Sequence, residues 1–307
     1  MTRTPTVLLA ALLLALTACS TAAESEQAAQ GSSAETASAD PDPSAAETTA
    51  GDPGSGEEYV ALGDSYTAAF QTGPSDATDG CYRSRANYPH LIAAETGATL
   101  TDVSCGGATS RALANPQRTL DGNQAPPQFD ALSEDTDLVT LRIGGNDFDL
   151  FTTLALQCVR LAQQQPEGSP CREANAQLLQ RVDEIEQRLA KAIAQISRRA
   201  PGAQVLAVGY PEIVPASGRC DLLPLAEGDY PFARELNLGF NEALRGAAEA
   251  TGATYVDVFE ATSGHHICAD EPWVAGVEVP RGNAIPYHPY PEEQEAAAEA
   301  VLAALAE

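Results

Sequence analysis

Basic residues are scarce in this sequence. Lys and Arg together account for 17 of 307 residues against 43 Asp and Glu, which gives a formal net charge of -26 at pH 7. Proteins that bind nucleic acid neutralise phosphates with clustered Lys and Arg, so this balance excludes a nucleic-acid partner. The acidic excess is typical of a solvated surface that repels anions, and it needs no further functional explanation.

Metal-binding patterns and membrane-spanning segments are missing as well. The chain has four histidines and no C-x-x-C pair, and His265 and His266 beside Cys268 lack the spacing that zinc sites favour. We therefore expect no metal and no cofactor. Apart from the apolar run 7–16, no segment approaches about 18 uninterrupted apolar residues, so no membrane span is predicted.

The N-terminus has the composition of an export signal. Arg3 is followed by the apolar run 7–16 and by small residues before Cys19, which is the order expected of a signal peptide over residues 1–18. Residues 16–19 (LTAC) resemble a bacterial lipobox. The resemblance implies cleavage before Cys19 and lipidation of its thiol, which would anchor the chain to a bilayer. An ordinary secretory signal with a fortuitous cysteine is the alternative.

Residues 19–57 are expected to form an acidic tether. Beyond Cys19 they contain no aromatic residue and no Leu, Ile, Val, Lys or Arg. Such a segment cannot bury enough apolar surface to offset the entropy lost on ordering. We expect the tether to hold a monomeric folded domain, residues 58–307, at the extracellular face of the cell membrane, or to release it into the medium when clipped.

The six cysteines of the folded domain suggest disulfides. An even number in an exported chain is typical of a disulfide framework, although six cysteines permit 15 pairings. We take sequential pairing as the working hypothesis: Cys81–Cys105, Cys158–Cys171 and Cys220–Cys268.

Short apolar runs alternate with helical patterns through the domain. Alternation of this kind predicts an α/β fold, in which a parallel sheet of about five strands lies between helical layers. The predicted strands are 58–62, 99–103, 138–143, 204–208 and 254–258. The predicted helices are 88–96, 172–200, 237–251 and 292–306, of which the second has apolar residues at spacings of three and four.

Three loops after predicted strands carry serine-, glycine- or asparagine-containing motifs. Ligands of such folds bind beyond the carboxyl ends of the strands. Residues 63–66 (GDSY) follow the first strand and place a serine on a tight turn, as a nucleophile needs. Residues 104–109 (SCGGAT) follow the second strand and residues 144–147 (GGND) the third. Their backbone N–H groups and asparagine amide are suited to bind a substrate oxygen.

His288 completes a set of four motifs. A lone histidine is usually structural, but this one follows the three motifs in order, just before the last predicted helix. Together they resemble the four blocks of the SGNH hydrolases over about residues 59–307, and the cysteines with residues 208–211 (VGYP) resemble secreted actinobacterial esterases and lipases of that family. The resemblance implies a three-layer α/β/α sandwich with a flavodoxin-like sheet. It also implies that Ser65 is the nucleophile, that His288 is the general base, and that the oxyanion hole comprises the N–H groups of Ser65 and Gly107 and the Asn146 side chain.

One position departs from the SGNH pattern. Most members have an Asp three residues before the His, where this sequence has Ile285. A catalytic histidine needs a partner at its other ring nitrogen. Some secreted members use a main-chain carbonyl there, so we expect the Ile285 carbonyl to orient His288. Asp257 and Asp270 are the weaker alternatives.

The sequence therefore predicts a serine hydrolase of carboxylic esters, from lipids or small molecules, that forms an acyl-enzyme. Removal of O-acetyl groups from a cell-envelope glycan is the second hypothesis, and a surface lipoprotein that binds without catalysis is the third. An apolar acyl tunnel would favour lipid esters, and a shallow cleft lined by Trp and Tyr would favour a glycan. The presence of both Ser65 and His288 argues against the third hypothesis.

Overall fold

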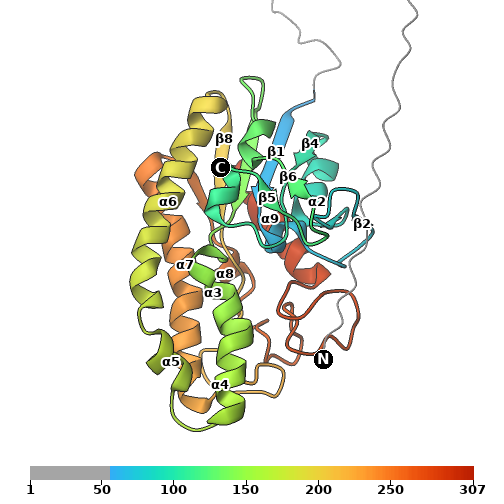
Figure 1. Cartoon of the computed structure of the whole chain (residues 1–307). Coiled ribbons are helices and arrows are strands. Elements are labelled where there is room, and N and C mark those ends of the chain that lie inside the picture. The colour runs from blue at the N-terminus through green and yellow to red at the C-terminus, as the bar shows by residue number, and fades with distance from the viewer. Residues whose placement is uncertain (1–55) are drawn as a thin grey trace, which may run out of the picture. The chain divides into compact units, whose positions relative to one another are not determined.

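The computed structural model describes residues 56–307, and the expected export signal, Cys19 and nearly all of the expected tether lie outside them. Its centre is a five-stranded parallel sheet with the strand order β4-β1-β7-β8-β9. Strands β1, β4 and β8 of this sheet are labelled in Figure 1. The strands are β1 (Glu58–Gly63), β4 (Thr99–Asp102), β7 (Leu138–Arg142), β8 (Gln204–Val208) and β9 (Thr254–Val256). These are the five strands that the sequence predicts. The chain reverses its direction across the sheet at β1, and loops that flank such a point are where these folds bind ligands.

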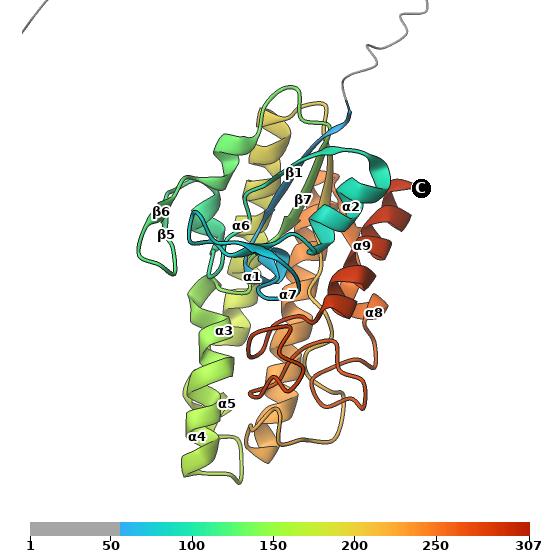
Figure 2. The ribbon, with the colours of Figure 1, turned by 90° about the vertical axis from the view of Figure 1, so that its right-hand side faces the viewer.

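Helices cover both faces of the sheet. One core cluster lies between the sheet and the long helices α6 (Leu178–Arg199) and α7 (Tyr230–Thr251). A second cluster lies on the other face, under α2 (Tyr88–Thr96) and α9 (Pro291–Leu305), as Figure 2 shows. The fold is thus the expected α/β/α sandwich.

Local sequence explains the two helical layers. In α6 the buried residues Ile185, Leu189 and Ile193 recur at intervals of four, which gives the helix one apolar face. In α2 the Asn87 side chain accepts a hydrogen bond from the His90 N–H at the start of the helix, and Gly97 ends it in the left-handed conformation.

Shorter elements fill the connections. The short helices are α1 (Ser65–Ala68), α3 (Leu150–Thr152), α4 (Val159–Gln164), α5 (Pro170–Asn175) and α8 (Val258–Ala261), with a π-helical turn at Thr153–Cys158. Two-residue strands pair as β2 (Ser75–Asp76) with β3 (Arg83–Ser84) and as β5 (Gln117–Arg118) with β6 (Gln124–Ala125). Single 3₁₀ turns occupy Ser110–Leu113, Gln128–Ala131, Asp147–Asp149 and Glu227–Asp229.

Two helix boundaries differ from the prediction. The helix expected over 172–200 is divided into α5 and α6, and the helix expected from residue 237 begins at Tyr230. Asp229 lies where the first of these helices begins and directly precedes α7. Its carboxylate accepts hydrogen bonds from the N–H groups of Cys171 and Arg172 at 2.9 Å each, so it joins the start of α5 to the residue that precedes α7.

Three disulfides connect the loops: Cys81–Cys105, Cys158–Cys171 and Cys220–Cys268. They are the three sequential pairs of the working hypothesis. Between residues 56 and 307 no helix is long and apolar enough to cross a membrane. The same residues contain no group of three or more His, Cys, Asp or Glu side chains placed to hold a metal ion.

Candidate active site

Ser65 lies immediately beyond the carboxyl end of β1, as the first residue of α1. Asp64 caps this helix, since its Oδ1 accepts a hydrogen bond from the Tyr66 N–H at 3.0 Å. Gly63 exchanges two hydrogen bonds, of 2.8 and 2.9 Å, with the side-chain amide of Gln128. Ser65 is 5% exposed, so this loop holds a serine at the sheet edge in a nearly buried position.

Tyr210 links the serine loop to the loop after β7. Its hydroxyl donates to Asp64 Oδ2 at 2.5 Å and accepts from the Gly145 N–H at 3.0 Å. Burial raises the pKa of Asp64 to about 6, against the opposing effect of the hydrogen bonds from Tyr210 and Tyr66. Nothing in the sequence marks Tyr210 as a site residue, although residues 208–211, which contain it, carry part of the family resemblance.

Gly107 and Asn146 lie on two loops that are joined directly. The Asn146 Nδ2 donates to the carbonyl oxygen of Ala108 at 3.0 Å, next to Gly107. Gly107 has a φ of 71°, a left-handed conformation that favours glycine. Cys105, two residues earlier, donates its N–H to the Gly63 carbonyl at 3.1 Å. The three loops expected to form the oxyanion hole therefore lie together at one edge of the sheet.

His288 lies in the loop before α9 and is 6% exposed. Its ring packs between three aromatic rings, with centroid distances of 5.5 Å to Tyr66, 5.9 Å to Phe70 and 5.1 Å to Phe151. Tyr66 directly follows Ser65, and its hydroxyl donates to the Tyr287 carbonyl at 2.8 Å. Distant parts of the sequence thus meet here, although among the described residues no hydrogen bond joins the side chains of Ser65 and His288.

The partner of the histidine ring is not the one predicted. The Nδ1 of His288 lies 2.8 Å from the carbonyl oxygen of Pro286. The Ile285 carbonyl instead accepts the backbone N–H of His288 at 3.1 Å. The prediction of Ile285 is therefore wrong by one residue, because a tight turn uses the Ile285 carbonyl for its own hydrogen bond and leaves the next carbonyl to face the ring.

The two alternative carboxylates are not partners of the ring either. Asp257 caps α8 and pairs with Arg245 at 2.8 Å. Neither Asp257 nor Asp270 hydrogen-bonds to His288 in the part of the chain that the structure describes. A main-chain carbonyl thus occupies the place of the usual aspartate.

A buried ion pair lies beneath the serine helix. Arg142 and Glu293, both with fully buried side chains, are joined at 2.6 Å. Arg142 also donates to the carbonyls of Gly209 at 2.7 Å and Tyr66 at 3.2 Å, and Gln294 donates to the same Tyr66 carbonyl at 3.0 Å. Through Arg142, this ion pair holds the backbone of Tyr66, the residue that follows Ser65. The sequence analysis placed Arg142 in a strand but gave it no role, since nothing in the pattern shows that Glu293 faces it.

An apolar pocket adjoins the histidine. Phe151 contacts the His288 ring and also lines this pocket. Residues of the π-helical turn, the loop after β8, helix α7 and the segment between α8 and α9 form the rest of the wall. The lining comprises Phe151, Leu154, Ala155, Ile213, Val214, Leu223, Leu225, Ala233, Asn237, Phe240, Ile267 and Tyr287.

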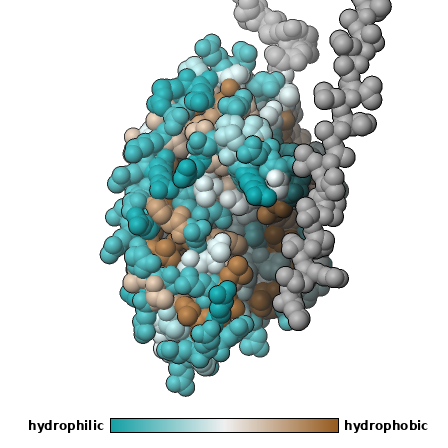
Figure 3. Space-filling view, in the orientation of Figure 1, coloured by the Kyte–Doolittle hydropathy of each residue, from teal (hydrophilic) through white to brown (hydrophobic). Residues whose placement is uncertain are grey.

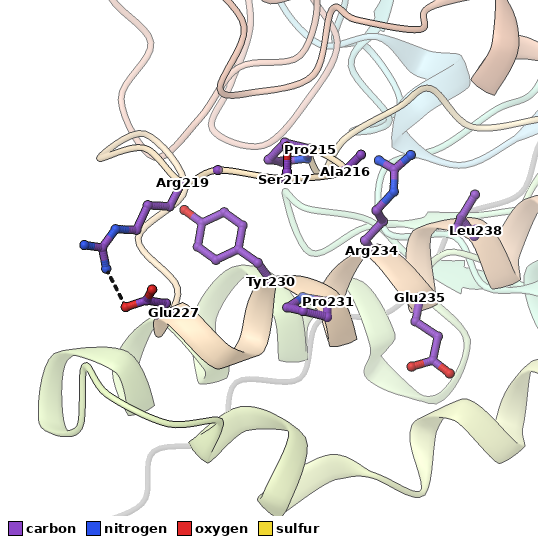
Figure 4. A pocket seen from close by; sticks show the side chains of 11 residues that line it. Pro215, Ala216, Ser217, Arg219, Glu227, Tyr230, Pro231, Arg234, Glu235 and Leu238 are labelled. Carbon is purple, nitrogen blue, oxygen red and sulfur yellow. Dashed lines mark hydrogen bonds and ion pairs between the residues drawn. The ribbon is translucent and has the colours of Figure 1, made fainter.

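A larger hollow lies elsewhere, against the start of α7. Figure 4 shows Arg219 paired with Glu227 on one side of it, and Arg234 and Leu238 on the other. Its lining does not include Ser65, Gly107, Asn146 or His288. Figure 3 shows that the surface on one face of the molecule is mostly hydrophilic with scattered apolar patches, which agrees with the acidic composition.

The fold thus brings a serine loop, two glycine-containing loops and a buried histidine together at one edge of the sheet, as expected of a serine hydrolase. The sequence profile of the GDSL-like Lipase/Acylhydrolase family matches residues 61–296. The chain therefore belongs to this family, and it is a carboxylic ester hydrolase.

Relatives and solved structures agree with this assignment. "Lipase 2" of Streptomyces coelicolor is 44% identical over 220 residues, which are 69% of this chain and 72% of the relative. A lipase of Streptomyces rimosus is 31% identical over 76% of this chain and 80% of its own. The structures of phospholipase A1 from Streptomyces albidoflavus and of the extracellular lipase from S. rimosus match with TM-scores of 0.68 and 0.67. Each is 28% identical and covers 81% of this chain and 99% of its own.

Proposed function

We propose that this protein is an exported, lipid-anchored monomeric esterase that hydrolyses esters of lipid acyl chains. The observation that carries the proposal is the apolar pocket whose wall includes Phe151, because the Phe151 ring contacts His288 and the rest of the wall offers an acyl chain an apolar surface. Burial of each methylene from water contributes about 0.8 kcal/mol. The lipase and phospholipase names of the relatives point to the same substrate class.

The proposed mechanism is acyl transfer through Ser65. His288 accepts the serine proton as the hydroxyl attacks the ester carbonyl, and the Pro286 carbonyl holds the opposite ring nitrogen. The developing oxyanion accepts hydrogen bonds from the N–H groups of Ser65 and Gly107 and from Asn146. His288 then protonates the leaving alcohol, and water repeats both steps on the acyl-enzyme.

The glycan hypothesis receives less support from the site. An enzyme that binds sugar is expected to offer exposed aromatic faces. Trp273 is stacked on His265 at a centroid distance of 3.6 Å, so one of its faces is covered. Trp273 does not line the apolar pocket.

The chain-length profile tests the proposed substrate class. We expect the full-length chain, with its disulfides formed, to hydrolyse p-nitrophenyl decanoate with a higher kcat/KM than the acetate. Ala155→Phe should fill part of the pocket and lower kcat/KM for the decanoate about thirtyfold relative to the acetate, since it displaces two or three methylenes worth ~2 kcal/mol. Ala216→Phe, in the remote hollow, is the matched control and should leave the ratio unchanged. A preference for acetate in the native chain would favour a deacetylase.

The pH profile tests the role of His288. Burial lowers the pKa of His288 to about 4, against a smaller opposing effect of its hydrogen bond to the Pro286 carbonyl. A general base must be neutral to accept a proton, so the base stays active down to the pH at which it protonates. We expect kcat/KM to fall on the acid side near pH 4 rather than near the ordinary histidine value of about 6.5. Initial rates between pH 3.5 and 8 measure this limb, and a midpoint near 6.5 would contradict the expected shift.

The lipid anchor is tested at Cys19. The position lies outside the described residues, and the support for it is the signal-like segment before it. We expect Cys19→Ser to move the protein from the membrane fraction of an expressing bacterium to the soluble exported fraction, because the acyl chains have no thiol to attach to. Esterase activity in each fraction reports the change. An unchanged membrane fraction would contradict the anchor.

A further inference from the structure

Asp147 is a buried carboxylate that the proposed mechanism does not use. It is 1% exposed and directly follows Asn146. Its Oδ1 accepts the Ser110 N–H at 2.7 Å, and its Oδ2 accepts the Ser110 hydroxyl at 2.5 Å. The same Oδ2 accepts from Arg188 Nη1 at 2.9 Å. Burial of a carboxylate costs free energy unless donors surround it, and three donors do so here.

Asp147 and Asn146 together join the loop after β7 to the loop after β4. Ser110, which Asp147 binds, follows Gly107 by three positions. The Asn146 Nδ2 binds the Ala108 carbonyl at 3.0 Å, so two consecutive residues of one loop hold two nearby residues of the other. Asn146 is partly exposed, whereas Asp147 is buried. The spacing between the Gly107 N–H and the Asn146 amide therefore depends on both contacts.

The chain directly after Asp147 has an uncommon backbone conformation. Phe148 and Asp149 have φ values of 56° and 59°, although neither is glycine. The guanidinium of Arg188 lies over the Phe148 ring, 4.2 Å from its centroid, and also binds Asp147. Residues in such conformations persist where their surroundings hold them, and they are frequent at functional sites. Helix α6, which carries Arg188, thus holds both the turn and the carboxylate.

We infer that Asp147 is a positioning residue for the oxyanion hole, because it holds the Gly107 N–H and the Asn146 amide at the spacing that the transition state needs. The inference rests on the proposed acyl transfer at Ser65 and extends it to a residue outside the hole. A carboxylate accepts from all three donors, whereas an amide would turn an N–H towards one of them. Donors that are displaced stabilise the growing negative charge less, so loss of the carboxylate should raise the barrier and leave substrate binding unchanged.

The test replaces this carboxylate with an amide in the full-length chain with its disulfides formed. Asp147→Asn should lower kcat on p-nitrophenyl decanoate about thirtyfold and change KM by less than about twofold. The rate constant of labelling by a fluorophosphonate should fall by a similar factor, since the phosphoryl oxygen gains negative charge in the same hole. The final stoichiometry should stay at one label per chain. A variant that was only partly folded would instead label fewer chains at the native rate.

Glu212→Gln is the matched control. Glu212 is a buried carboxylate in the loop after β8, and it accepts from Arg234 Nη1 and from the Gly264 N–H at 2.7 Å each. The change removes the same charge from a similar ion pair. It should lower the melting temperature by about as much as Asp147→Asn does, while kcat and the labelling rate constant stay native.

Ser110→Ala supplies a milder second variant. It keeps the carboxylate and its pair with Arg188 and removes one hydrogen bond between the loops. The expected fall in kcat and in the labelling rate constant is about fivefold. A native labelling rate constant in Ser110→Ala would overturn the inference, whether or not Asp147→Asn folds.

Two other results would also overturn the inference. Equal losses of kcat in Asp147→Asn and Glu212→Gln would mean that the effect comes from general stability and not from the hole. Ser65→Ala in the same assays tests the proposed function separately. If Ser65→Ala kept its activity, the proposed function would fail, and the inference with it, whatever the Asp147 variant did.

Discussion

Replacing Ser65 with alanine is expected to lower kcat by about 10⁴- to 10⁶-fold on every ester, because the variant lacks the proposed nucleophile of the acyl-enzyme. The residue stands at the carboxyl end of β1 on a loop fixed by Asp64 and Gln128, so the change removes one hydroxyl and little else. Steady-state rates on p-nitrophenyl decanoate measure the loss. A fluorophosphonate should add one label to the native chain, on the peptide that contains Ser65.

Two further variants test whether Ser65→Ala loses kcat because the reacting hydroxyl is missing. His288→Ala should lose a similar factor, and the double variant should be no worse than either single one, since the two groups act in one step. Ser263→Ala replaces an exposed serine in the loop after α8 and should keep full activity and labelling. Retention of the label by Ser65→Ala would assign the nucleophile to another residue.

Replacing Glu293 with alanine is expected to lower the free energy of unfolding by about 3–5 kcal/mol, because it leaves the guanidinium of Arg142 buried without its counter-charge. Both side chains are fully buried, and the pair is joined at 2.6 Å. Urea denaturation of the full-length chain measures the loss. Because Arg142 also donates to the Tyr66 carbonyl, kcat should fall with stability.

The neighbouring residue supplies a matched control. Glu292 pairs with Arg281 at the surface, where each side chain is 38% exposed. Glu292→Ala should therefore cost less than about 1 kcal/mol. Replacing both members of the buried pair, as Arg142→Met with Glu293→Leu, should restore much of the lost stability. If Glu292→Ala and Glu293→Ala lowered the free energy of unfolding equally, burial would not be the reason for the stability of the Arg142–Glu293 pair.

The sequence predicted the sheet better than the helix boundaries, and the reason is physical. A buried parallel strand such as 138–142 needs a short run of apolar residues, and that run is visible in the sequence. The start of α5, by contrast, is held by the carboxylate of Asp229, which lies more than fifty residues further along the chain. No local pattern contains that information.

At the candidate site, too, local motifs were predictable and contacts between distant parts of the chain were not. The positions of Ser65, Gly107 and Asn146 follow from motifs at strand ends, and the structure brings their loops to one edge of the sheet. His288 was recognised from its place before the last helix. The choice between the carbonyls of Ile285 and Pro286 depends on one turn, which residue types alone do not determine. The Arg142–Glu293 pair was missed for a related reason, because it joins the last residue of a strand to a helix near the end of the chain.

The hydroxyl of Tyr210 bridges Asp64 and Gly145 and so ties two loops to one phenol. In the proposed reaction, negative charge grows on the substrate oxygen between these loops. Donors that had to turn towards that oxygen would add reorganisation energy to the barrier, whereas donors fixed in advance do not. By fixing both loops, Tyr210 keeps the hydrogen-bond donors in place before the substrate binds. It does so from behind the loops that face the substrate.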